Sequence, residues 1–123
     1  MNLVQKAAAL MARADVVVLS SVSGDGYPRP CALSKIRAEG AHSFYVATGA
    51  LGVKAAHFRK SPKAGACFFE GGDSVTLVGE AEIVEDGALK RELWLHWFID
   101  HFPGGPSDPN YCVLRFTGRE ATL

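Results

Sequence analysis

The sequence has little of several features that would assign it to a specialised class of protein. It has no apolar run close to the roughly 18 residues that a membrane-spanning helix needs, and its start is too short and too charged for a signal peptide. Its 13 basic and 13 acidic side chains leave no basic excess to neutralise nucleic-acid phosphates. We therefore expect one cytoplasmic domain, residues 1–123, that binds neither membranes nor nucleic acid.

Cysteine is also scarce. Cys31, Cys67 and Cys112 lie far apart, and no CxxC pair occurs. An odd number of widely spaced cysteines argues against a disulfide framework or a zinc ribbon. Each cysteine has apolar neighbours, so we interpret all three as small buried side chains. The four histidines show no metal-ligand spacing and no motif of a hydrolytic nucleophile occurs, so we expect no metal site.

The balanced total charge conceals an uneven distribution along the chain. Residues 1–62 carry eight Lys or Arg against three acidic side chains, whereas residues 63–123 carry five against ten. The two halves therefore have formal charges of +5 and −5. Either the halves simply attract one another, or the first half holds a site for an anionic ligand.

Periodicity predicts a mainly β domain. Runs rich in β-branched and aromatic residues, bounded by glycine, proline or aspartate, predict strands. These runs are residues 16–22, 31–39, 42–48, 63–70, 74–85 and 111–123. Helical patterns cover residues 2–13, 53–60 and 88–102. Because turns are short and no long crossover occurs, we expect a six-stranded, mostly antiparallel β-barrel with short flanking helices.

Particular residues indicate where these elements bend or meet an edge. Pro28 and Pro30 lack a backbone donor, so we expect their stretch to lie at a sheet edge or a bulge. Gly79 stands in the middle of a predicted strand and indicates a bend or a close backbone approach. In the helix predicted at 53–60, we expect Val53 and Ala56 to face inward, with His57 as a further candidate for that face.

The segment that joins the third strand to this helix, TGALGVK, could bind a phosphate. A helix N-terminus offers free N–H groups and the positive end of the helix dipole. Thr48 adds a hydroxyl, Gly49 begins the loop, and Lys54 adds a positive charge. Arg29, held between two prolines, could reach the same place. The alternatives are a solvated lysine beside a flexible turn and an ordinary edge-strand arginine.

The predicted helix at 88–102 carries more apolar surface than a small monomer needs. Trp94 and Trp97 lie on it, and large aromatic side chains contribute much of the binding energy at protein interfaces. Two interpretations remain open: core packing within one chain, or a dimer interface.

The order of these segments resembles a known family. GYPRPCALSKI after the first strand is followed by FYVATGALGVK, AHFRKSPKAGACFF and DSVTLVGEAEIVED, and then by a tail of helix and loop. This ordered set is similar to the FMN-binding split barrels related to pyridoxamine 5'-phosphate oxidase, of the short bacterial type that includes the general-stress flavoproteins. The resemblance covers roughly residues 10–120.

The resemblance implies a homodimer with two FMN sites between the subunits. The isoalloxazine ring would lie along the second and third strands, near Cys31, Ala32 and Leu33. The phosphate would meet the loop and helix after the third strand, and Trp97 or Trp94 would approach from the other subunit. Arg29 is our candidate for a second cation at the phosphate. The cofactor-binding residues implied in this way are Arg29, Cys31, Ala32, Leu33, Thr48, Gly49, Lys54, Ser74 and Trp97.

The same resemblance implies an FMN-dependent oxidoreductase of unknown small-molecule substrate. The longer oxidase members have a C-terminal extension with substrate-binding residues, and this chain ends without one, so we do not expect pyridoxamine phosphate oxidase activity itself. Where many relatives carry Ser-x-Lys, this chain has Gly52-Val53-Lys54. That difference motivates two alternatives: a non-enzymatic carrier or sensor of a flavin or another planar cofactor such as haem, and a dimeric protein whose site has decayed.

Overall fold

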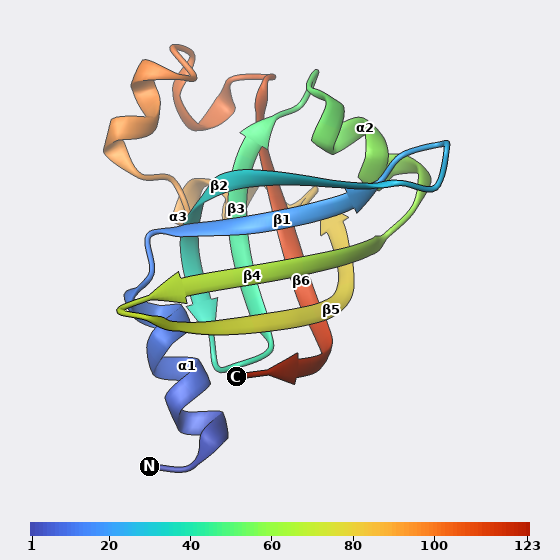
Figure 1. Cartoon of the computed structure of the whole chain (residues 1–123). Coiled ribbons are helices and arrows are strands. Elements are labelled where there is room, and N and C mark those ends of the chain that lie inside the picture. The colour runs from blue at the N-terminus through green and yellow to red at the C-terminus, as the bar shows by residue number, and fades with distance from the viewer.

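The computed structural model describes all 123 residues and contains six strands that form a closed antiparallel barrel (Figure 1). The order of strands around the barrel is β1-β2-β3-β6-β5-β4. The predicted fold class is therefore confirmed. The strands are β1 (Val16–Val22), β2 (Pro28–Glu39), β3 (Ser43–Gly49), β4 (Lys63–Glu70), β5 (Asp73–Ile83) and β6 (Tyr111–Thr122). The helices are α1 (Leu3–Arg13), α2 (Val53–Lys60) and α3 (Gly87–Glu92), followed by two 3₁₀ turns, η1 (His96–Asp100) and η2 (Gly105–Ser107).

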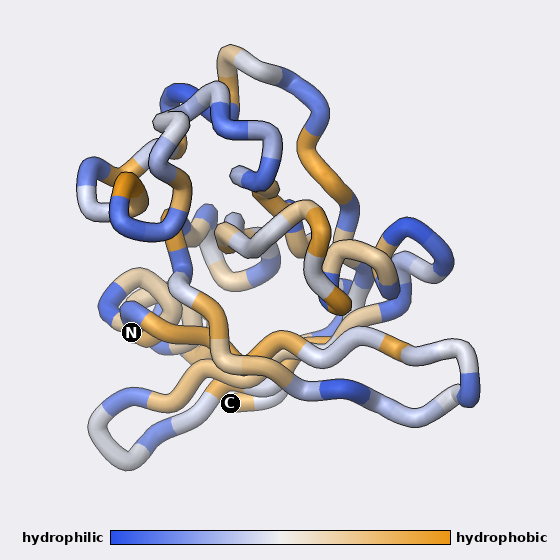
Figure 2. Tube along the Cα trace, turned by 90° about the horizontal axis from the view of Figure 1, so that it is seen from above, coloured by the Kyte–Doolittle hydropathy of each residue, from blue (hydrophilic) through white to orange (hydrophobic).

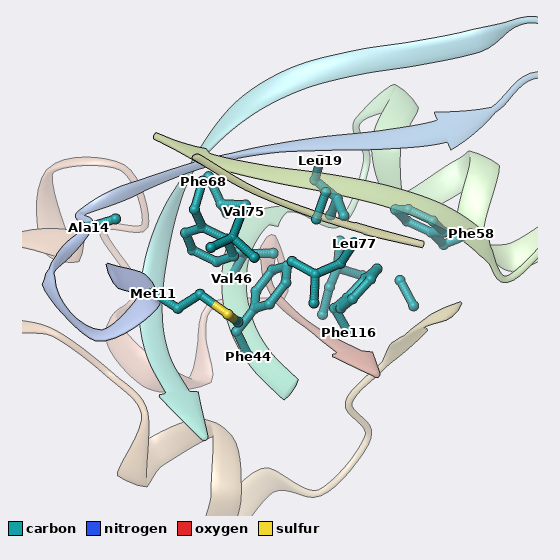
Figure 3. Close-up of a cluster of buried hydrophobic side chains, with 14 of the residues drawn as sticks. Met11, Ala14, Leu19, Phe44, Val46, Phe58, Phe68, Val75, Leu77 and Phe116 are labelled. Carbon is teal, nitrogen blue, oxygen red and sulfur yellow. The ribbon is translucent and has the colours of Figure 1, made fainter. Parts of the chain in front are cut away.

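The barrel interior is filled by a continuous apolar core. Alternate residues of β1 point inward, as the period of a strand requires, and Val17 and Leu19 are completely buried. Phe44 stacks on Phe116 with 4.8 Å between ring centroids and meets Phe68 edge-on at 5.0 Å (Figure 3). Such aromatic pairs add to the free energy of burial, so this core is the main source of stability.

Helix α1 closes one end of the barrel. The side chain of Asn2 accepts a hydrogen bond from the backbone N–H of Gln5, and the side chain of Gln5 accepts one from the backbone N–H of Asn2. This capping box satisfies donors that would otherwise be free at the start of the helix. At the other end, the Lys35 ammonium donates to the carbonyls of Met11 and Ala12 at 2.7 and 2.8 Å. The capping box thus stabilises the start of the helix, and Lys35 fixes its end to the barrel.

The first half of β2 is an exposed ribbon. Residues 28–34 pair with β1 only, because pairing with β3 starts at Lys35, and the ladder shifts register between Lys35 and Arg37. Pro28 and Pro30 lie in this singly paired half, so the expected edge position is confirmed. The strand begins three residues earlier than the sequence indicated, at Pro28. In Figure 2 the polar tip of the hairpin between β1 and β2 projects from the barrel. One edge of this ribbon is therefore available for other contacts.

Gly79 marks the place where β5 and β6 approach most closely. The ladder between these strands shifts register between Val78 and Gly79. A Cβ atom at Gly79 would lie 2.1 Å from the carbonyl oxygen of Thr117 and 2.8 Å from the Cα of Gly118. The close backbone approach predicted from the sequence is confirmed, and it excludes any side chain at this position.

The single helix predicted for residues 88–102 is wrong. The segment forms the short helix α3, a break at 93–95, and the 3₁₀ turn η1. Apolar side chains occur on all sides of this segment, and one straight helix could not bury them against a single wall. The break allows Leu93 and Phe98 both to be buried against the outside of β3 and β6, in a second cluster with Tyr45, Phe102 and Tyr111.

Two predictions of burial are also wrong. Cys31 is exposed, because it lies on the ribbon half of β2, while Cys67 is partly buried and only Cys112 is buried. In α2 the buried residues are Lys54, Ala55 and Phe58, so the helix is rotated relative to the expected orientation. Val53 is 71% exposed and Ala56 is exposed as well. No helix of the structure is long and apolar enough to cross a membrane.

Candidate functional site

Two adjoining pockets lie along the ribbon half of β2, and Thr48 lines both. We refer to them together as the cleft, with a polar end and an aromatic end. The polar end, of about 560 Å³, lies between β2 and the start of α2. The aromatic end, of about 370 Å³, lies between β2, the end of β3 and η1. In Figure 1 the end of β3 lies between α2 and the orange segment that follows α3. The polar end is lined by Ser23, Arg29, Pro30, Cys31, Thr48, Gly52, Val53, Lys54 and His57. The aromatic end is lined by Ala32, Leu33, Ser34, Ala47, Thr48, Gly49, Trp97, Phe98, His101, Phe102 and Asn110.

Lys54 is the buried cation of the polar end. Only 8% of the residue is exposed, and its ammonium donates to the hydroxyl of Ser21 at 2.9 Å and to the backbone carbonyl of Arg29. Burial lowers the pKa of Lys54, and the nearby thiol of Cys31 partly opposes that shift. An ammonium has three N–H donors, so one remains for a ligand in the cleft.

The start of α2 adds backbone donors to the same end. Its N-cap is Gly52, in an extended conformation, and no side chain caps the helix. The amides of the first turn therefore have no side-chain partner, and they carry the positive end of the helix dipole. Gly52 itself donates to the carbonyl of Gly49 at 3.0 Å, which folds the loop tightly in front of the helix.

Arg29 lies at the rim of the polar end rather than inside it. Its guanidinium donates to the carboxylate of Asp25 at 2.9 Å and to the hydroxyl of Ser23 at 3.1 Å. Both side chains of the ion pair are about half exposed. Hydrogen bonds from Ser23 and from the backbone of Tyr27, with the charge of Arg29, lower the pKa of Asp25. These contacts hold the guanidinium on the hairpin at the mouth of the cleft.

The aromatic end is formed by a cluster of packed rings. Trp97 is 41% exposed and meets Phe98 edge-on with 4.5 Å between centroids. Phe98 in turn packs on Trp94 at 5.6 Å and on Phe102 at 6.4 Å. On the opposite wall, Ala32 and Leu33 of β2 are only partly covered. This end therefore offers an apolar slot with one aromatic wall.

Asn110 fixes the loop between β3 and α2. Its backbone carbonyl accepts from the N–H of Ala50 at 2.9 Å, and its side-chain oxygen accepts from the N–H of Leu51 at 3.2 Å. A Cβ atom at Gly49 would lie 3.4 Å from the Asn110 amide, so the two residues fit closely. The sequence analysis did not identify Asn110 or His101. The one sequence feature that could have indicated the contact of Asn110 with this loop is its polar side chain directly before the final strand.

The structure brings together eight of the nine residues predicted to form the site. Ser74 is the exception: it is exposed on β5, where it pairs with Phe69 of β4, and β1 and β4 separate that strand from β2. Trp97 lines the aromatic end within a single chain, whereas the resemblance implied an approach from the other subunit. The residues that converge on the cleft are Arg29, Cys31, Ala32, Leu33, Thr48, Gly49, Lys54 and Trp97.

Comparisons with known proteins agree with the fold. The chain is similar in structure to a Clostridium acetobutylicum protein related to general stress protein 26 of Bacillus subtilis, of the pyridoxinephosphate oxidase family, with 25% identity and a TM-score of 0.85 over 94% of this chain and 83% of that one. General stress protein 26 of Bacillus anthracis shares the fold at 22% identity and a TM-score of 0.80, over 95% of this chain and 90% of that one. Among curated proteins, none matches the chain. The family model described as pyridoxamine 5'-phosphate oxidase matches residues 3–123, and the protein therefore belongs to the pyridoxamine 5'-phosphate oxidase family.

Proposed function

We propose that the cleft binds FMN, with the phosphate at the polar end and the isoalloxazine ring at the aromatic end. One observation carries this proposal: a pocket with a buried ammonium and a pocket with an aromatic wall adjoin along β2 and share Thr48. Ligand sites are typically concave and mostly apolar, with a few well-placed polar groups. A ligand with a charged group at one end and a flat, weakly polar body at the other suits this arrangement.

The residues of the polar end fit a phosphomonoester. Such a group carries about two negative charges near pH 7 and has three acceptor oxygens. Lys54 has one free N–H, and the uncapped start of α2 offers backbone donors. Thr48 lies at the boundary with the aromatic end and brings a hydroxyl. Arg29 would be the second cation, reached by exchanging its exposed contact with Asp25 for one with the phosphate.

The aromatic end fits a planar ring system. Residues 31–33 offer small or apolar side chains and a strand edge without a partner strand, whose backbone groups could bond the polar edge of the ring. Trp97 faces the same slot from η1. When bound, FMN would supply hydride or electron transfer, while these residues orient the ring and keep water from its aromatic side.

An FMN-dependent oxidoreductase is the first functional candidate and a non-enzymatic flavin carrier is the second. The carrier is favoured by one observation: His101 is the only titratable side chain that lines the aromatic end. An oxidoreductase that needs proton transfer there would depend on His101 or on water. Repeated oxidation of a reduced donor with stoichiometric reduction of an acceptor would support the enzyme. Flavin bound without such turnover would support the carrier.

A homodimer is part of the proposal. Val16 and Val18 of β1 are 52% and 40% exposed, and Phe69 of β4 is 69% exposed, on the outward face beside the ribbon half of β2. Exposed apolar groups of this kind mark interaction surfaces. Ser74 pairs with Phe69 and is exposed, so it would lie at the interface with a second copy packed on this face. Light scattering should give the mass of two chains, and Val18→Glu should give that of one.

A cytoplasmic location fits the three free thiols, because thiols stay reduced in that compartment.

The direct test of the cofactor is the absorption spectrum of the purified protein after incubation with FMN and removal of unbound ligand. We expect the visible absorption bands of oxidised flavin in an equimolar amount. A protein that remains colourless would contradict the proposed function.

A further inference from the structure

Lys54 is the first member of a buried chain of hydrogen bonds that no part of the proposed cofactor chemistry explains. Its ammonium donates to the hydroxyl of Ser21 at 2.9 Å, and the same hydroxyl lies 2.7 Å from Nδ1 of His57. Ser21 is completely buried in β1, and His57 lies one helical turn after Lys54 in α2. Three side chains from two elements therefore meet behind the polar end of the cleft.

The direction of donation along this chain follows from the chemistry of its members. An ammonium can only donate, so the Ser21 oxygen must accept from Lys54. Ser21 is completely buried, and His57 is the one acceptor in hydrogen-bond range of its proton, so the arrangement that satisfies this proton has Ser21 donating to an unprotonated Nδ1. The proton of a neutral imidazole consequently lies on Nε2, on the side away from Ser21. The order of donation is Lys54 to Ser21 to His57.

A lysine stem has four rotatable bonds, and holding it in one position has an entropic cost. Ser21 and the Arg29 carbonyl each accept one N–H and thereby fix two directions of the ammonium. His57 in turn fixes the hydroxyl of Ser21, because it accepts that hydroxyl's proton. The third N–H of Lys54 is then aimed at one place in the cleft before any ligand arrives.

We propose that Ser21 and His57 are positioning residues for phosphomonoester recognition, which hold the Lys54 ammonium in its binding orientation through the ordered chain Lys54 to Ser21 to His57. This inference rests on the proposed FMN function and deepens it. Ser21 does not line the polar end, and His57 lines it but meets Lys54 only through Ser21. Both act on the phosphate through Lys54, so their effect should appear only for ligands that carry one.

The test compares FMN with riboflavin, which has the same ring system and no phosphate. Flavin fluorescence titration gives the dissociation constant of each ligand, and their ratio isolates the phosphate contribution. Lys54→Met should lower the preference for FMN by about tenfold to a hundredfold, as expected for a lost charged hydrogen bond. Ser21→Ala should lower it by roughly tenfold and His57→Leu by roughly threefold, each with little change in riboflavin binding.

Matched variants separate positioning from folding. His57→Gln keeps a side-chain acceptor for the Ser21 proton and should restore most of the preference lost in His57→Leu. Two control variants make the same chemical changes at nearby side chains that have no hydrogen bond to this chain. They are Ser20→Ala, next to Ser21, and Lys60→Met, on the same helix as Lys54. Should Ser21→Ala fail to fold, the His57 pair tests the proposal alone. If His57→Leu leaves the preference at the wild-type value, or if Ser21→Ala weakens both ligands equally, the proposal is overturned.

A second measurement does not depend on flavin. Nitrogen-15 NMR of histidine-labelled protein reports which ring nitrogen carries the proton, and the His57→Gln spectrum identifies the His57 signals. We expect an unprotonated Nδ1 and a protonated Nε2 in the free wild-type protein, with a weaker preference in Lys54→Met. A wild-type His57 protonated on Nδ1 would reverse the order of donation and overturn the proposal. Absence of FMN binding together with the expected NMR pattern would instead count against the proposed function alone.

Discussion

The barrel interior and the cleft differ in what their side chains do. The interior is closed and apolar, with Phe44, Phe68 and Phe116 packed at ring distances near 5 Å. The cleft combines a buried cation, a helix start without a side-chain cap, and a stretch of β2 that is mostly exposed. Features that lower stability in a core are tolerated in the cleft, where a ligand could use them. Changes in the two regions should therefore affect different measurements.

The largest expected effect is on stability and comes from the interior. Phe44→Ala removes a fully buried ring and leaves a cavity that its neighbours cannot fill, so the free energy of unfolding should fall by about 3–5 kcal/mol. Urea unfolding followed by tryptophan fluorescence measures it. The matched truncation at the surface, Leu3→Ala, should change stability by about 0.5 kcal/mol or less, because Leu3 is 68% exposed. A similar loss in both variants would contradict the distinction between core and surface.

The next effect belongs to the polar end of the cleft. Lys54→Met keeps the apolar stem and removes the charge, so FMN affinity should fall by about 1.5–3 kcal/mol. Riboflavin affinity should remain near its wild-type value. Because a buried charge is removed, the free energy of unfolding should not fall in parallel. Calorimetric titration with each ligand checks the first expectation, and equal losses for both ligands would argue against a phosphate at Lys54.

The ring of Tyr111 lies between the two regions and packs against Trp94, Phe98 and Phe102. Burial raises its pKa to about 12, and its hydroxyl donates to the Lys90 carbonyl at 2.9 Å. The unfolded chain loses this proton near pH 10. The folded state thus binds more protons between pH 10 and 12, and stability must fall as pH rises through that window. The loss should be about 1–2 kcal/mol after allowance for solvent screening. The difference between the urea midpoints at pH 9 and pH 11 should be smaller in Tyr111→Phe than in the wild type. An equal difference in the two proteins would contradict this assignment.

The smallest expected effect concerns the aromatic end. Trp97→Ala should weaken FMN and riboflavin alike, by roughly threefold to tenfold, because both ligands carry the same ring and an aromatic contact contributes about 0.5–1.5 kcal/mol. Trp97→Phe keeps an aromatic face and should recover part of this loss. The ratio of the two dissociation constants should stay constant in both variants. A change in that ratio would show that the two ends of the cleft are not independent.

Most of the fold could be predicted because local signals agreed with the final packing. β1 and β4 have the predicted ends, and Gly79 was correctly read as a close approach. The helix expected at 88–102 was wrong because its apolar pattern reflects packing against the outside of the barrel, which no local period reports. Tertiary contacts also decided the rotation of α2: Phe58 and Lys54 turn inward because the barrel offers an apolar surface and the Ser21 hydroxyl.

The cleft was only partly predictable. Lys54, Thr48 and Gly49 lie on one continuous segment, so their proximity followed from the chain itself. The partners of Lys54 could not be found in this way, since Ser21 lies 33 residues away and nothing in its neighbours marks it. Cys31 was expected to be buried from its apolar neighbours, but the ribbon half of β2 exposes it. A strand segment that is paired along one edge has the same sequence pattern as one that is paired along both.

The most direct test of the account is the ratio of the riboflavin and FMN dissociation constants in the wild-type protein and in Lys54→Met. We predict that the wild type binds FMN at least about tenfold more tightly than riboflavin, since the phosphate gains a charged hydrogen bond at Lys54. In Lys54→Met the ratio should approach one, while Lys60→Met keeps the wild-type ratio. A wild-type protein that binds neither flavin, or that binds both equally, would contradict the assignment of this cleft to FMN.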